Sequence, residues 1–511
     1  MISAKPAPVP PVLEAMIGAI LMHDTENHMT TRIERDCLGE MEIPDERYYG
    51  IQTTRMMAVS GAGRLPAIHF PGLFRALFQI KKACALANAE IGALDKEVAD
   101  AIAWAADRAL EGKYDTEFPL DIWQGGGYTI LNMNVNEVLG NAANERLTGH
   151  KGQDRVHPNT HVNMGQSTND TIPSATHLAA APEIDRVVEG LDALAAVFAA
   201  KAEEFKDIVK IGRTCWQDAL PLTLGQEFSG YASLLRRLAG KFRALRPGCF
   251  ELVMGGSAVG TGLGAAPGYM DAFYRKISEE LGENVRPMEN LFDGFQNADF
   301  LVSLSGVVRE AATSLSKIAK DLRLLSSGPR SGFMEITLPA CAPGSSIMPG
   351  KINPTVPEMV VQIAHQVVGN DVAVTLAYEE GELDLNVWDA TLYKCLFENL
   401  GLLAEELVIF RRDCVEGIGA NRERSAHEAE TSLALSTVVA ATFGYPKGVE
   451  TAHYAEKHGV TVKEAVLAMG LMTPEEADKM INPALMTDPS RMAEAIAAFR
   501  TNLNSRKFRS S

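Results

Sequence analysis

One short stretch of the sequence, Pro343 to Glu358, combines chain-breaking residues with side chains that can do chemistry. It reads PGSSIMPGKINPTVPE. Proline and glycine recur through it, so a helix cannot continue across it and we expect a loop. The loop carries two hydroxyls, one ammonium and one amide, at Ser345, Ser346, Lys351 and Asn353. Such side chains suit a site that holds a small anion and removes a proton, although a plain connecting loop is the alternative interpretation.

A second polar block precedes Pro173 and a helical pattern. It contains Ser167, Thr168 and Asn169, whose short hydroxyl and amide groups are typical of a helix N-terminus. The free backbone N–H groups of a helix N-terminus can bind a carboxylate. The alternative is that the block only caps a helix.

The composition argues against a nucleic-acid partner and against a membrane span. The 511 residues carry a formal net charge of -17, which argues against nucleic acid because phosphate binding needs a basic face. An anionic ligand would then depend on local positive charge from Lys351 and from helix N-termini. The longest uncharged stretch, Leu252 to Met270, contains six glycines and a proline, so we expect a loop and no membrane span.

The cysteines and glycines suggest neither a metal nor a cofactor. Seven scattered cysteines, without CxxC or Cys/His spacing, predict neither a disulfide framework nor a zinc site. A reducing cytoplasm is the simplest location. The glycine-rich tract Trp123 to Tyr128 lacks the GxGxxG and P-loop spacings, so we expect no nucleotide cofactor.

The pattern along the chain predicts an all-α protein of three domains. Residues 1–28 are expected to be a disordered extension or the product of too early a start codon. Residues 29–163 should form a mainly helical domain, with helical runs at Leu73 to Leu94 and Glu97 to Leu110. Residues 164–420 should form a central bundle, and residues 421–511 a small helical domain in which Thr473 begins a helix.

The central domain shows the clearest pattern. Apolar residues recur there at alternating spacings of three and four, which is typical of helices packed in a left-handed bundle. Five such runs predict a five-helix bundle: Ile184–Phe198, Phe228–Leu245, Leu301–Leu325, Val360–Val367 and Leu396–Phe410.

Several blocks, in the same order, resemble those of the aspartase/fumarase superfamily. The segment from Gly344 to Pro354 is similar to the family signature GSSxMPxKxNP. The other similar blocks are RIERDCLGEMEIPDERYYGIQT, NMNVNEV, HVNMGQSTND, GRTCWQDALPLTLGQEF and LRLLSSGPR. GELDLNVWD and the RIERDCLGE block look more like aspartate ammonia-lyase than like fumarate hydratase.

The resemblance implies a fold and an activity. It implies a homotetramer with a 20-helix core, in which three subunits build each active site. It implies reversible anti-elimination of ammonia from L-aspartate to give fumarate, without a cofactor. The alternatives are a fumarate hydratase, a lyase of the same mechanism acting on a substituted aspartate, and a catalytically silent scaffold protein.

The resemblance also assigns roles to residues. Ser345 would be the general base, working as an alkoxide under a loop that closes over the substrate. Lys351 and Asn353 would hold the carboxylate on which charge develops, and Ser346 would be a further substrate-binding residue. The second carboxylate would be bound by Ser167, Thr168 and Asn169, with Thr129 and Thr214 as further substrate contacts.

Three positions depart from the family pattern. Many relatives have histidine, and some aspartases glutamine, where this chain has Cys215, so the usual histidine partner of Glu358 is absent. We interpret Cys215 as a small buried residue. Ile130, after Tyr128 and Thr129, replaces a hydroxyl, and Trp216 replaces a modest aliphatic residue. These changes either compensate one another in the core or reshape the pocket for another substrate.

Overall fold

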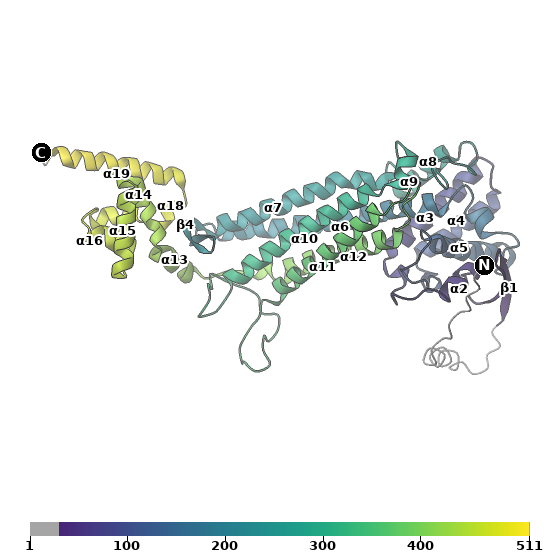
Figure 1. The fold of residues 1–511 in the computed structure, drawn as a ribbon, viewed down its shortest axis with the longest axis horizontal. Coiled ribbons are helices and arrows are strands. Elements are labelled where there is room, and N and C mark those ends of the chain that lie inside the picture. Colours follow the sequence, from purple (N-terminus) through teal and green to yellow (C-terminus); the bar gives the residue numbers. More distant parts are fainter. Residues whose placement is uncertain (1–29, 510–511) are drawn as a thin grey trace, which may run out of the picture. The chain divides into compact units, whose positions relative to one another are not determined.

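The computed structural model describes residues 30–509, and the predicted extension at residues 1–28 lies outside the described part. The chain divides into two compact units. Unit 1 contains the chain up to Ala175 together with Val253–Phe292, and unit 2 contains Thr176–Leu252 together with the chain from Asp293 onward. Both units are built mainly from helices (Figure 1), which confirms the predicted fold class. The three predicted domain boundaries stay a prediction.

Unit 1 combines one β-hairpin with several helices. The strands β1 (Thr31–Asp36) and β2 (Gly39–Pro44) pair antiparallel, with Thr31 opposite Pro44. The helices described below are α2 (Ile51–Met57), α3 (Pro71–Glu90), α4 (Lys96–Leu110), α5 (Thr129–Thr148) and α8 (Tyr269–Leu281). The helices α3 and α4 confirm the two predicted helical runs, whereas the hairpin was not predicted.

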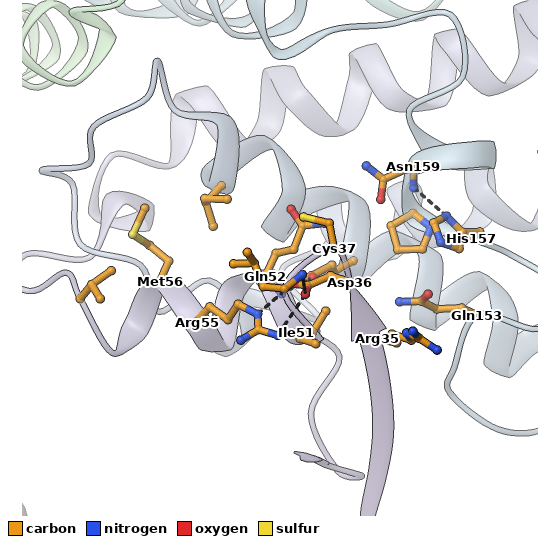
Figure 2. Close-up of a pocket in the computed structure, with 15 residues that line it drawn as sticks. Arg35, Asp36, Cys37, Ile51, Gln52, Arg55, Met56, Gln153, His157 and Asn159 are labelled. Carbon is orange, nitrogen blue, oxygen red and sulfur yellow. Dashed lines mark hydrogen bonds and ion pairs between the residues drawn. The ribbon is translucent and has the colours of Figure 1, made fainter. Parts of the chain in front are cut away.

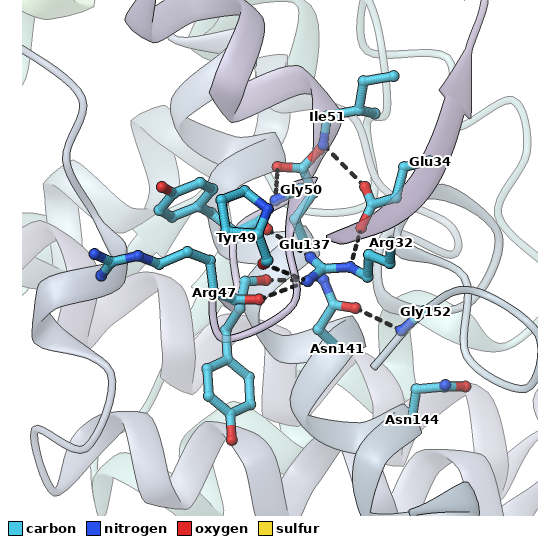
Figure 3. Close-up of polar contacts among 12 residues, drawn as sticks. Arg32, Glu34, Arg47, Tyr49, Gly50, Ile51, Glu137, Asn141, Asn144 and Gly152 are labelled. Carbon is cyan, nitrogen blue, oxygen red and sulfur yellow. Dashed lines mark hydrogen bonds and ion pairs between the residues drawn. The ribbon is translucent and has the colours of Figure 1, made fainter. Parts of the chain in front are cut away.

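A buried carboxylate on α5 fixes the start of α2. Glu137 accepts hydrogen bonds from the backbone N–H groups of Gly50 (2.9 Å) and Gln52 (2.8 Å) and from the Thr53 hydroxyl (2.7 Å). Glu34 of β1 accepts from the Ile51 N–H over 2.9 Å (Figure 3). The N–H groups at the start of α2 thus find side-chain acceptors, which a helix N-terminus requires when it is buried.

Unit 2 contains the long helices. They are α6 (Thr168–Glu204, in this unit from Thr176), α7 (Leu224–Leu245), α10 (Asp299–Leu325), α11 (Thr355–Glu379) and α12 (Asp389–Asp413). Each contains one of the five predicted apolar runs, and most apolar residues of these runs are buried, with Leu245 and Ile363 half-buried. The five predicted helices are therefore confirmed. Packing of these apolar faces supplies most of their stability, since isolated helices are marginal in water.

Two strands and a group of shorter helices complete unit 2. The strands β3 (Val209–Thr214) and β4 (Gln217–Thr223) form an antiparallel hairpin. The shorter helices are α13 (Arg422–Thr431), α14 (Ser436–Phe443), α15 (Tyr445–His458), α16 (Val462–Ala468), α17 (Pro474–Met480), α18 (Pro483–Met486) and α19 (Pro489–Arg509). The predicted start at Thr473 is confirmed, because its hydroxyl accepts from the Glu476 N–H in a capping box.

Candidate active site

The loop that carries Ser345 is closed at its base by hydrogen bonds between its two arms. The Gly344 N–H donates to the Lys351 carbonyl over 2.7 Å, and the Asn353 amide donates to the Gly344 carbonyl over 3.0 Å. Pro343 and Ile352 form an antiparallel bridge beside them. A Cβ on Gly344 would lie 2.7 Å from the Asn353 backbone nitrogen, so the base of the loop requires glycine.

The oxygen of Ser345 faces two backbone donors. It accepts hydrogen bonds from the N–H groups of Ile347 (3.2 Å) and Met348 (2.9 Å). Fixed N–H groups aimed at an oxygen stabilise negative charge on it. The arrangement can therefore favour the alkoxide, which is the form that a serine needs in order to remove a proton. Ser345 is half-buried, while Ser346 and Lys351 are exposed on the same loop.

A cavity of about 560 Å³ lies at the base of this loop. Its lining includes Lys351 and Asn353 of the loop, together with Thr337 and Leu338. This volume is in the range of small-molecule sites, for which about 300 to 1,000 Å³ is usual. An ammonium and an amide thus border a space that can hold a small anion.

Glu358 has an arginine as its partner. It lies in the first turn of α11, and its Oε1 is 3.1 Å from Nη2 of Arg323 near the end of α10. The two side chains are 40% and 39% exposed. An arginine stays protonated at working pH, so this pair cannot relay a proton as a histidine would. Arg323 belongs to the LRLLSSGPR block, but its residue type alone did not mark it as a partner of Glu358.

The turn between β3 and β4 exposes Cys215 and Trp216. Thr214 pairs with Gln217, and the two residues between them have positive φ angles of 52° and 60°. A two-residue turn of this kind matches the twist of the strands and directs both side chains outward. Cys215 is exposed, so its interpretation as a small buried residue is wrong. Thr214 is exposed too, and Trp216 is 69% exposed, with its ring 6.5 Å from that of Phe333.

In unit 1, Thr129 begins α5 directly after a strained tyrosine. Tyr128 has a φ of 56°, is fully buried, and donates its hydroxyl to the Ile122 carbonyl over 2.9 Å. The Thr129 hydroxyl donates to the Gly126 carbonyl over 2.7 Å, and its side chain is exposed. The phenol of Tyr128 therefore belongs to the core, whereas Thr129 lies at the surface of a helix N-terminus.

The block Ser167 to Asn169 forms the N-terminus of α6. The Ser167 oxygen accepts from the Asn169 N–H over 3.3 Å, and the Ser167 N–H donates to Asp170 over 2.9 Å. Ser167 therefore caps α6, as the alternative interpretation holds, while the binding of a carboxylate by this block stays a prediction. Thr168 is buried, and the Asn169 amide donates to the Ala258 carbonyl over 2.8 Å. Capping does not exclude anion binding, because several N–H groups of a first turn have no intrahelical partner.

A fully buried lysine, which the sequence analysis missed, lies behind this helix N-terminus. The Lys81 ammonium of α3 donates to Asn163 Oδ1 (3.0 Å) and Gln166 Oε1 (2.8 Å), just before Ser167. Asn132 and Asn136 of α5 donate to the same Asn163 oxygen over 3.2 and 3.1 Å. The network thus ties α3 and α5 to the turn that precedes α6. The four-residue spacing of the two asparagines within NMNVNEV was the available signal.

Thr168 belongs to this network and is also one of the predicted substrate-binding residues. The Asn132 amide donates to the Thr168 hydroxyl oxygen over 3.2 Å. Asp170 lies next to it and accepts from the N–H groups of Gly255 and Ser257 over 3.3 and 3.0 Å. Burial raises the pKa of Asp170 to about 7, although these N–H groups oppose the shift. Burial also lowers the pKa of Lys81 to about 8.

A pocket of about 680 Å³ opens on unit 1 beside the β1–β2 hairpin (Figure 2). Asp36 of β1 and Arg55 of α2 form a two-pronged ion pair in it, with distances of 2.8 and 3.0 Å. Ile130 lines the pocket, so the residue that departs from the family pattern faces open space beside Thr129. The sequence analysis missed this pocket because its lining comes from distant segments without a shared motif.

The described residues show neither a group of metal ligands nor a membrane-spanning helix. Within residues 30–509, no group of three or more His, Cys, Asp or Glu side chains is placed to hold a metal ion. Among the helices of the same residues, none combines the length and the apolar composition that crossing a membrane requires.

Comparison with known proteins identifies the family. The family model described as "Lyase" matches residues 39–369, and the one described as "Fumarase C C-terminus" matches residues 435–488. A fumarate hydratase class II of Methylorubrum extorquens is 45% identical over 90% of this chain and 98% of its own length. An aspartate ammonia-lyase of a Bacillus species is 41% identical over 90% of this chain and 98% of its own length.

Solved structures agree with the sequence comparison. A fumarate lyase:delta crystallin from Brucella melitensis, bound to cobalt, has a TM-score of 0.87 and 41% identity, covering 90% of this chain and 100% of its own. The class II fumarase from Schistosoma mansoni has a TM-score of 0.87 and 35% identity, with the same coverage. The chain is therefore a lyase that belongs to the aspartase/fumarase superfamily.

The buried ammonium generates a prediction about stability and pH. Lys81 binds its proton less tightly in the folded protein than in the unfolded chain, so the unfolded state holds more protons between about pH 8 and pH 10.5. The free energy of unfolding should then rise by about 1 kcal/mol from this group between pH 7 and pH 9. We expect Lys81→Met to lose this rise. Urea unfolding at both pH values measures it.

The control for this prediction is Lys113→Met, which removes an exposed lysine. It should keep the pH dependence of the wild type. Equal pH dependence in Lys81→Met and in the wild type would contradict the assignment of the effect to the buried ammonium.

Proposed function

We propose that the protein catalyses the reversible addition of a small nucleophile to fumarate, with water as the nucleophile and L-malate as the product. The pair of backbone N–H groups on the Ser345 oxygen carries this proposal, because it supports a serine alkoxide as the base. The relatives support fumarate hydratase better than the aspartate ammonia-lyase that the sequence blocks favour, since more of them are named as hydratases.

The reaction would begin with removal of the proton next to a carboxylate. Ser345 takes this proton, and the electron pair moves into the carboxylate to give a dianionic aci-carboxylate. Lys351 and Asn353 hold that group, with Ser346 beside them, and the cavity that they line supports this role. Collapse of the dianion then expels the leaving group from the neighbouring carbon and forms the double bond.

The other carboxylate needs donors of its own. Ser167, Thr168 and Asn169 at the start of α6 provide these, together with Thr129 at the start of α5. Thr214 of the β3–β4 hairpin is a further contact. A helix N-terminus attracts an anion by about 0.3 to 1 kcal/mol at an exposed position, which helps to overcome the negative charge of the whole chain.

Aspartate ammonia-lyase is the second candidate, and one observation favours it. Water leaves as hydroxide unless an acid protonates it, whereas the ammonium group of aspartate leaves as neutral ammonia without such help. The usual histidine is replaced by Cys215, and Glu358 is paired with Arg323. A site without an evident acid for hydroxide therefore suits ammonia better. A substituted aspartate is a variant of this candidate, in which Ile130 and Trp216 contact the larger group.

We further propose a homotetramer, located in the cytoplasm, that needs no metal or organic cofactor. An apolar stripe on α11 supports association. Val368, Val372 and Leu376 are 37%, 54% and 57% exposed and lie one helical turn apart on one face. Ile347 of the Ser345 loop is 84% exposed, as expected of a loop that a second copy of the chain covers.

A substrate assay tests the proposed reaction and separates the candidates. Purified protein is given L-malate and then L-aspartate, and the ultraviolet absorbance of fumarate is followed. We expect fumarate to form from L-malate. Formation from L-aspartate alone would replace the first candidate by the second. Turnover of neither substrate would refute fumarate hydratase and the unmodified aspartate ammonia-lyase, and would favour the substituted-aspartate variant or a silent scaffold.

Removal of the Ser345 hydroxyl tests the proposed base. Ser345→Ala should lower kcat by at least a thousandfold, because no other group would take the proton, while the oligomer stays intact in size-exclusion chromatography with light scattering. The control Ser490→Ala removes an exposed hydroxyl and should keep full activity. Near-normal turnover in Ser345→Ala would remove Ser345 as the base.

A charge on the apolar stripe tests the assembly. Val372→Glu should dissociate the oligomer, because the charge would be buried in the interface at a cost of several kcal/mol. Light scattering measures the mass. Ser490→Glu places the same charge at the start of α19 and should leave the mass unchanged. An oligomer of unaltered mass in Val372→Glu would show that this stripe lies outside the interface.

A further inference from the structure

Two segments of unit 2 pair antiparallel close to the Ser345 loop. The strand β7 (Ile336–Thr337) pairs with β8 (Gly419–Ala420), with Ile336 opposite Ala420 and Thr337 opposite Gly419. The contact continues beyond the strands, because a Cβ on Gly417 would lie 2.4 Å from Cγ of Pro339. The same register, continued along both segments, places Cys341 beside the residues at the end of α12.

This register places two cysteines beside each other. The Sγ of Cys341 lies 3.9 Å from the carbonyl oxygen of Asp413, the residue directly before Cys414. That oxygen belongs to the peptide group that Cys414 shares with Asp413, so the thiol already reaches the backbone of its neighbour. Both cysteines are free thiols, Cys341 exposed and Cys414 only 1% exposed. A disulfide needs Cα atoms about 4.4 to 6.8 Å apart, and this contact is compatible with that separation.

We propose that Cys341 and Cys414 form a reversible disulfide that tethers the base of the Ser345 loop to the end of α12. Only Ala342, Pro343 and Gly344 separate Cys341 from Ser345. The bond would join a loop stem to a helix that is packed in the bundle. The effect on activity rests on the proposed function, in which the loop closes over the substrate, whereas the bond itself does not.

The chemistry requires a hydroperoxide as the oxidant. The exposed Cys341 thiol attacks one peroxide oxygen, the O–O bond breaks, and the products from hydrogen peroxide are a sulfenic acid and one water. The Cys414 sulfur then attacks the Cys341 sulfur, the S–O bond breaks, and a second water leaves. Burial raises the pKa of Cys414 to about 12, so Cys341 is the thiol that meets the oxidant first. A dithiol reductant reverses the bond by exchange.

The disulfide would lower turnover because closure of the loop over the substrate requires a mobile loop base. The hydrogen bonds at the loop base can break and re-form during a turnover, whereas a covalent bond persists until it is reduced. A disulfide next to the base would hold the stem in one arrangement. Transient disulfides of this kind fit a reducing compartment, where structural disulfides are rare.

The test treats the full-length protein with hydrogen peroxide, blocks the remaining thiols with an alkylating reagent and maps the peptides by mass spectrometry without reduction. We expect a cross-linked peptide that joins Cys341 to Cys414, at least a tenfold loss of turnover, and recovery after dithiothreitol. Cys341→Ser should keep its turnover under peroxide. Cys37→Ser removes another exposed thiol and should stay as sensitive as the wild type.

Several outcomes would overturn the proposal. One is a map in which Cys341 is oxidised to sulfinic acid or is bonded to another cysteine, and another is equal peroxide sensitivity of Cys341→Ser and the wild type. The exposed Cys215 remains in Cys341→Ser, so damage at Cys215 is told apart from the disulfide. The peptide map decides the bond even if the protein turns over neither L-malate nor L-aspartate, which separates this proposal from the proposed function.

Discussion

The ammonium of Lys81 is the interaction on which the turn before α6, and with it the proposed carboxylate-binding residues at the start of that helix, depends. It is fully buried, and its hydrogen bonds go to the amide oxygens of Asn163 and Gln166. Removing a charge from water costs several kcal/mol unless the group is well hydrogen-bonded, so such a lysine persists only where its contacts compensate for that cost. Here the contacts hold the turn that sets the first residues of α6, and the asparagines of α5 join the same oxygen. One buried cation therefore holds the turn before α6, to which α5 is also hydrogen-bonded.

The Ser345 loop follows a different physical rule. Its base is closed by backbone hydrogen bonds and by a glycine that no other residue could replace, while its tip is exposed and carries Ile347 and Met348. A closed base with an exposed apolar tip can move as one piece and then bury that tip against another surface. The serine oxygen stays aligned with its two N–H donors in such a movement, because both donors belong to the same loop.

Much of the fold could be predicted because its helices carry repeating apolar patterns, and all five bundle helices were. The hairpins could not be predicted. In β3–β4 the strands contain a proline and few alternating residues. Its turn also uses Cys215 and Trp216 at positive φ, where asparagine or glycine is usual. The loop residues were recognisable by type. Lys81 was not, because a lysine within a helical run is normally at the surface, and only the folded chain reveals that it is buried.

The pairing of Glu358 with Arg323 bears on the choice between water and ammonia. A histidine between a carboxylate and the substrate can give up and regain a proton near neutral pH, whereas an arginine cannot. With Cys215 exposed at its turn, the described part of unit 2 pairs Glu358 with an arginine and has a thiol in the usual place of the histidine. Hydration would then require water itself, or a group from a second copy of the chain, to manage the proton of the leaving hydroxide. Loss of ammonia makes no such demand. The relatives therefore favour water as the nucleophile, whereas the local chemistry favours ammonia. The choice between the two depends on the residues around the leaving group and not on the base.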